Sequence, residues 1–78
     1  RYKERNGRSR MTMKEQLVHA TKSHLTGMFD RHIANVHVYM ANSAGIGEHS
    51  DIIEAIEIEL DQAAKFKDML EVLEEHVA

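Results

Sequence analysis

The sequence predicts an all-α fold, a two-helix antiparallel hairpin that dimerises into a four-helix bundle. Two long segments carry apolar residues at steps of three and four, which is the spacing of one helix face. A short connection with two glycines separates these segments, and the chain has no proline that would break either helix. At 78 residues the chain has room for one domain, which we expect over residues 11–78 after a basic arm.

The composition narrows the classes of function. The chain has no cysteine, which excludes disulfides, thiolate zinc sites and cysteine nucleophiles. We expect no signal peptide and no membrane association, because no apolar run approaches the roughly 18 residues of a membrane span. A cysteine-free chain of net charge −3 fits the cytoplasm.

Residues 1–10 form a basic arm, with five basic residues against one acidic residue, which we expect to be disordered. Met11 and Met13 follow at once and either could be a start codon, so the sequence leaves open whether the arm is native. The arm could contact nucleic acid phosphates. A nucleic-acid-associated accessory protein is therefore the first alternative function, although the ten acidic residues of 48–78 oppose it.

The first helix is predicted over residues 12–42. Thr12 is a candidate N-cap, and Glu15 stands at the spacing of a capping box. Gly27 costs about 1 kcal/mol relative to alanine inside a helix, and it either kinks the helix or admits a neighbouring backbone. Residues 36–40 alternate like a strand, but no second alternating segment could pair with them, so helix is favoured. The expected apolar face consists of Val18, Leu25, Met28, Phe29, Ile33, Val36 and Met40.

Residues 43–49 are predicted to connect the two helices. Two glycines two residues apart allow a tight reversal, and we expect a positive φ at Gly45 or Gly47. Gly45 also suits the position that follows the end of the first helix. The length of this segment suits a link between antiparallel helices.

The second helix is predicted over residues 50–77, with Ser50 as its N-cap and Asp51 in its first turn. Its apolar stripe is wider than one partner helix can cover, which implies a second contact surface and hence a homodimer or a higher homo-oligomer. We expect the oligomer core to contain Ile53, Ile56, Leu60, Ala63, Phe66, Leu70 and Leu73.

The polar residues show no pattern of a catalytic or metal-binding site. Most histidines are too far apart along the first helix to share a metal ion, and no Glu-x-x-His pattern occurs. We therefore expect no enzyme, no cofactor and no metal site. A histidine-based metal-binding bundle is the second alternative function, in which His24 or His32 from two chains would meet. The carboxylates expected to face mostly outward are Glu54, Glu57, Asp61, Asp68, Glu71 and Glu75.

The connection also carries a likeness to known sequences. Residues 42–53 read Asn-Ser-Ala-Gly-Ile-Gly-Glu-His-Ser-Asp-Ile-Ile. They resemble small uncharacterised proteins of marine T4-like cyanophages and related environmental sequences, over about residues 30–77. This chain has Ser43 and Ser50 where those proteins tend to have proline. The resemblance rests on Gly45, Ile46, Gly47, Glu48, His49 and Asp51.

The resemblance implies a bacteriophage origin and assigns no activity. We therefore expect a phage-type small helical oligomer that acts as a protein–protein interaction module and binds a host or viral protein. The expected location is the cytoplasm of the host cell, with the virion as the other possibility. Nucleic acid is not an expected partner.

Overall fold

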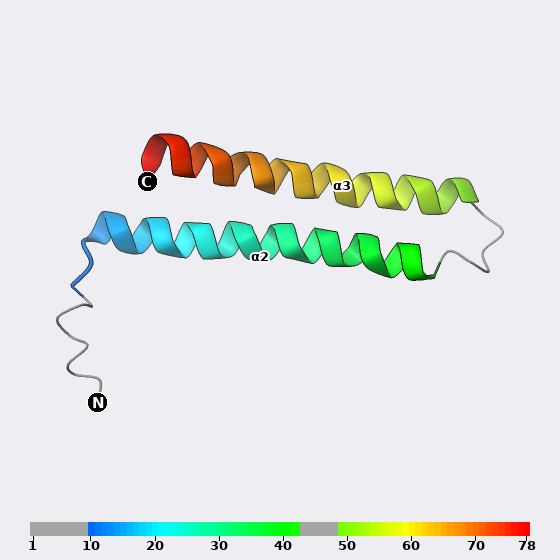
Figure 1. Cartoon of the computed structure of the whole chain (residues 1–78), viewed down its shortest axis with the longest axis horizontal. Coiled ribbons are helices and arrows are strands. Elements are labelled where there is room, and N and C mark those ends of the chain that lie inside the picture. Colours follow the sequence, from blue (N-terminus) through cyan, green and yellow to red (C-terminus); the bar gives the residue numbers. More distant parts are fainter. Residues whose placement is uncertain (1–9, 43–48) are drawn as a thin grey trace, which may run out of the picture.

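The computed structural model describes residues 10–42 and 49–78, which form an antiparallel helical hairpin (Figure 1). Helix α2 spans Met13–Ala41, helix α3 spans His49–Val72, and a π-helical turn, η1, spans Leu73–Val77. The two helices lie side by side along their whole length, and the described residues contain no strand. The predicted all-α hairpin is therefore confirmed.

Helix α2 begins with the predicted capping box. The Glu15 backbone N–H donates to Thr12 Oγ1 at 3.0 Å, and the Thr12 backbone N–H donates to Glu15 Oε1 at 2.9 Å. At the other end, the Asn42 backbone N–H donates to the carbonyls of Val38 and Tyr39. The helix runs through residues 36–40, so the strand signal there was misleading. Without a partner strand, the local alternation could not form a sheet.

Helix α3 begins at His49, one residue earlier than predicted. Ser50 therefore lies inside the helix and not at the capping position, a difference within the usual uncertainty of helix ends. At the other end, the Ala78 backbone N–H donates to the Leu73 carbonyl at 2.8 Å. That bond spans five residues, which makes the last turn a π-helix.

The predicted loop lies mostly outside the described residues. Gly45, Ile46, Gly47 and Glu48 belong to the segment 43–48, so the expected positive φ stays a prediction.

The core of the hairpin is thin. Two side chains of α2 and two of the α3–η1 helix are buried, and none of the described side chains is fully shielded from solvent. Half-buried apolar residues at steps of three and four continue the contact along both helices. The four buried side chains are Leu25, Val36, Ala63 and Leu73.

Gly27 does not bring another part of the hairpin close. Helix α2 continues unbroken through this residue, and no heavy atom lies within 4 Å of the position that a Cβ would occupy. Of the two predicted alternatives, the close approach of a neighbouring backbone therefore does not occur within the hairpin. The reason is that Gly27 is exposed and belongs to the side of α2 turned away from α3.

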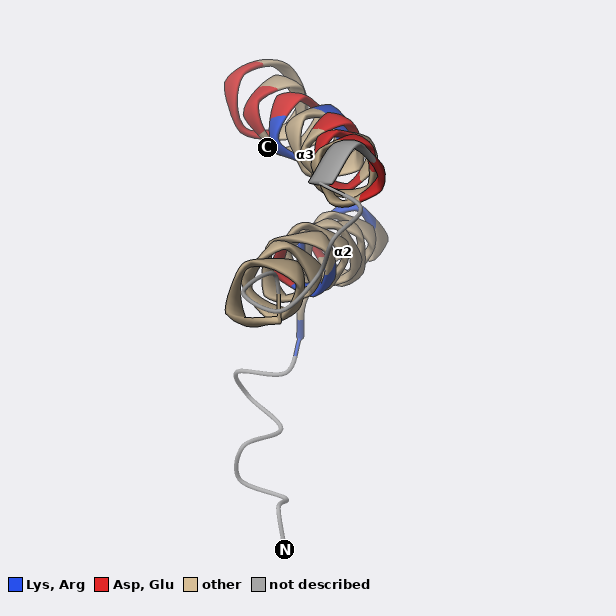
Figure 2. Ribbon diagram, turned by 90° about the vertical axis from the view of Figure 1, so that its right-hand side faces the viewer, with Lys and Arg blue, Asp and Glu red and all other residues tan. Residues whose placement is uncertain are grey.

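The two helices differ in charge. Helix α2 carries three basic and two acidic residues, whereas α3 and η1 together carry nine acidic residues and two lysines. Figure 2 shows the acidic residues spread over the α3 ribbon and few charged residues on α2. Any contact between two copies would therefore depend on which helices meet.

Candidate docking surface

A cluster of polar side chains lies between the helices near their middle. His32 Nδ1 lies 2.7 Å from Glu59 Oε1, and Asn35 Nδ2 donates to the same oxygen at 3.0 Å. The imidazole of His32 also stacks on Phe66, with ring centroids 5.8 Å apart and planes 10° from parallel. Only 13% of the His32 side chain and 16% of the Glu59 side chain are exposed. We call His32, Asn35 and Glu59 the polar seam.

Hydrogen bonding keeps Glu59 ionised. The hydrogen bonds from His32 and, second, from Asn35 lower the pKa of Glu59 below its ordinary value. An ionised carboxylate accepts hydrogen bonds only, so His32 contributes Nδ1–H as the donor. The seam thus joins α2 to α3 through one carboxylate oxygen with two donors.

The polar seam was missed in the sequence, because the carboxylates were expected to face outward. Glu59 stands seven residues after Ile52 and seven before Phe66, so it occupies the row of α3 that faces α2. That spacing was the available signal. Asn35 has no comparable signal, since an amide at the border of a helix face is common on a solvated surface.

The polar seam does not amount to a metal site. His32 and Glu59 supply two candidate ligands, whereas zinc sites use three or four protein ligands. The described parts of the chain contain no group of three or more metal-ligating side chains. His24 is exposed on α2 and is absent from the seam contacts. The metal-binding bundle and the absence of an enzyme both stay predictions.

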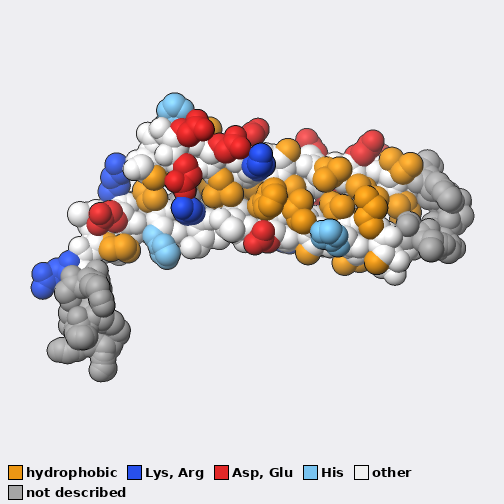
Figure 3. All heavy atoms as spheres, viewed as in Figure 1, with side chains coloured by type: hydrophobic (Ala, Val, Ile, Leu, Met, Phe, Trp, Pro, Cys, Tyr) orange, Lys and Arg blue, Asp and Glu red, His pale blue; other side chains and the backbone are white. Residues whose placement is uncertain are grey.

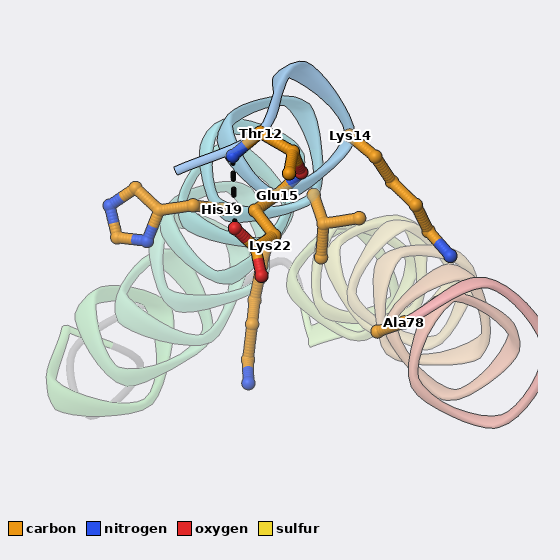
Figure 4. A pocket seen from close by; sticks show the side chains of 7 residues that line it. Thr12, Lys14, Glu15, His19, Lys22 and Ala78 are labelled. Atoms are coloured by element: carbon orange, nitrogen blue, oxygen red, sulfur yellow. Dashed lines mark hydrogen bonds between the residues drawn. The ribbon is translucent and has the colours of Figure 1, made fainter. Parts of the chain in front are cut away.

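A cavity at the open end of the hairpin, where α2 begins and η1 ends, offers no converging polar groups (Figure 4). Its Glu15 is engaged in the capping box, and its Lys22 forms an ion pair with Glu74. Lys14 and His19 point to opposite sides in Figure 4. We therefore find no candidate ligand site there.

The residues predicted to form the oligomer core divide into two groups. Ala63 and Leu73 are buried against α2, and the members Ile56, Phe66 and Leu70 are half-buried. Ile53 and Leu60 remain 56% and 47% exposed. The buried and half-buried members form the contact between the two helices. The exposed members, Ile53 and Leu60, lie outside that contact. Of the loop motif, Asp51 lies exposed in the first turn of α3.

Exposed apolar side chains outnumber buried ones. Eleven large apolar residues of the described chain are exposed, against the four side chains that are buried. In an isolated hairpin, all of this apolar surface would remain exposed to water, which is unfavourable. The eleven are Met11, Met13, Leu17, Val38, Met40, Ile53, Ile58, Leu60, Met69, Val72 and Val77.

A groove near the open end identifies one face of the hairpin. Thr26 of α2 and Lys67 of α3 both line this groove, so they belong to the same face. Residues seven apart in packed helices stay on one side. Thr26 therefore shares its side with Ile33 and Met40, and Lys67 shares its side with Leu60 and Ile53.

These rows end in an apolar surface at the loop end of the hairpin. It combines exposed Met40, Ile53 and Leu60 with half-buried Ile33 and Ile56. We call these five residues the loop-end patch. Figure 3 shows a patch of this kind, in which hydrophobic side chains cover both helices towards the loop. Charged side chains gather towards the open end and along the edge of α3.

Comparisons with protein-family models, with curated proteins and with solved structures found no match. The resemblance to cyanophage proteins thus stays a prediction. No helix in the described ranges is long and apolar enough to cross a membrane.

Proposed function

We propose that this protein is a protein–protein interaction module that self-associates through the loop-end patch. The observation that carries the proposal is that three exposed and two half-buried apolar side chains adjoin in the loop-end patch, while the hairpin core contains only four buried side chains. Exposed apolar surface of this kind marks interaction sites. A single core in a chain this short supplies only roughly 3–5 kcal/mol, and oligomerisation is one of the usual supplements.

The proposal includes the wider setting that the loop motif suggests. We place the protein among phage-type proteins that act on a host or viral protein in the host-cell cytoplasm, or in the virion. The support for this setting is the motif around Gly45–Gly47 together with the lack of cysteine. Self-association would leave the outer surfaces of the bundle for such a partner.

Sedimentation equilibrium at micromolar concentration tests the self-association, and two substitutions test the face. Leu60→Gln removes an apolar side chain of the patch. Ile58→Gln is the matched control, because Ile58 is 57% exposed on the same helix but points about 160° away. Burying the exposed half of Leu60 is worth about 1 kcal/mol per copy, so Leu60→Gln should weaken a dimer roughly 30-fold.

Three outcomes distinguish the possibilities. A weaker dimer with Leu60→Gln and an unchanged dimer with Ile58→Gln supports the patch as the docking face. Equal effects of both substitutions would place the contact elsewhere on the hairpin. A well-folded, cooperatively melting monomer at micromolar concentration would refute the proposed self-association.

A further inference from the structure

We infer that two copies pack face to face with their loop ends together, so that α3 of each copy lies against α2 of its partner. This inference rests on the proposed self-association and specifies its geometry. The two-fold axis runs parallel to the helices, and each helix then has antiparallel neighbours within its own copy and across the interface, as in an antiparallel four-helix bundle.

The position of the loop-end patch along the hairpin is the first supporting observation. A two-fold interface brings the same surface of both copies together. An axis parallel to the helices lays patch on patch while the helices overlap along their full length. An axis across the helices would instead lay each patch over the open-end groove of the partner. That groove is lined by Lys22, Lys67, Glu71 and Glu74, whose charges would lose water without gaining partners.

The acidic residues of α3 give the second observation. Directly beside the row of Ile53 and Leu60 runs the exposed row of Glu57, Ala64 and Glu71, which contains two carboxylates. Figure 3 shows acidic side chains along the edge of α3 that is turned away from α2. Contact of α3 with the partner's α3 would set two such rows against each other, and like charges across an interface oppose association.

The corresponding row of α2 carries less negative charge. Gln16, Ser23, Asp30 and His37 are exposed there, and only one of them is acidic. The contacts of His32 with Glu59 and of Lys22 with Glu74 fix which residues lie level in the hairpin. By the same alignment, Glu57 would lie within one turn of His37 of the partner's α2. A carboxylate then meets an imidazole at the loop end.

Cross-linking of mixed variants tests this arrangement, because the natural chain has no cysteine. His37→Cys and Glu57→Cys, both at exposed positions, are unfolded together, refolded to exchange subunits, and treated with a short bismaleimide. The product should join one copy of each variant, and each variant alone should give little dimeric product. Val38→Cys replaces His37→Cys in the control. It lies next to His37 in sequence but on another side of α2, so its yield should be several-fold lower.

The outcomes separate this inference from the proposed function. Self-association of Glu57→Cys with efficient cross-linking to itself would overturn the arrangement and leave the docking module intact. Self-association without mixed product would overturn it as well. A chain that remains monomeric in sedimentation equilibrium would instead refute the proposed function on which the arrangement rests.

Discussion

Replacing Gly27 by alanine should stabilise the protein. Gly27 lies well inside the 29-residue helix α2, and its backbone has no positive φ that would favour glycine. A Cβ at this position would meet no heavy atom within 4 Å. Alanine therefore adds no clash, and it reduces the backbone freedom of the unfolded chain.

The expected gain in the free energy of unfolding is about 0.5–1 kcal/mol, the difference between glycine and alanine inside a helix. For a chain of this size, that gain corresponds to a rise of about 2–8 °C in Tm. Thermal melts followed by circular dichroism at equal protein concentration measure it. The matched control is Ala34→Gly, seven residues further along the same exposed row, which should lower the free energy of unfolding by a similar amount.

A lower Tm for Gly27→Ala would refute this reasoning. It would mean that a neighbouring backbone approaches Gly27 in the assembled protein, on the side of α2 opposite to the one that packs on α3. Sedimentation equilibrium of the same variant separates the cases. Destabilisation with loss of self-association would locate a second interface at Gly27. Destabilisation with unchanged association would indicate that the backbone at Gly27 is not that of a regular α-helix.

Three further predictions concern the hairpin. Leu25→Ala should lower the free energy of unfolding by about 2–5 kcal/mol and more than Leu70→Ala, because Leu25 is only 7% exposed and Leu70 is half-buried; chemical denaturation measures both. Thr12→Ala should cost about 1 kcal/mol by removing one half of the capping box, also measured by denaturation. Glu59 has a lowered pKa in the folded state, so its stabilising effect is complete above its ordinary value of 4.5 and is lost as the pH falls through the lowered value. The stability difference between the natural chain and Glu59→Gln should therefore be larger at about pH 5 than at about pH 3, and an unchanged difference between these pH values would contradict this.

The helices could be predicted because their signals are local. The capping box of Thr12 and Glu15 is visible as a spacing of three residues, and it forms as expected. The apolar periodicity of α3 likewise indicates a helix whatever its partner. Even the misleading alternation of residues 36–40 could be discounted from the sequence, because a strand requires a second strand and none is present.

The contacts between the helices could not be predicted in the same way. Glu59 looks like one more carboxylate of an acidic helix, and its role depends on which turn of α2 lies opposite. That register follows from how all the side chains between α2 and α3 fit together. The division of the predicted oligomer core between the hairpin and the exposed face has the same origin. Ile56 and Leu60 belong to one stripe in sequence, but only the direction of α2 decides which of them it covers.

The hairpin contact and the proposed dimer contact would achieve specificity by different means. Within the hairpin, a shift of α3 by two turns along α2 would separate Glu59 from His32 and Asn35 and leave a half-buried carboxylate without its donors. The polar seam thus favours one register, as a polar residue does in a coiled-coil core.

The loop-end patch contains no polar side chain, so apolar contact alone would accept several orientations of a second copy. In the proposed dimer, selection among those orientations would come from the residues beside the patch, where Glu57 and Glu71 oppose contact of α3 with α3. In the proposed dimer, the charge difference between the helices would therefore select the orientation, and the apolar patch would supply most of the affinity.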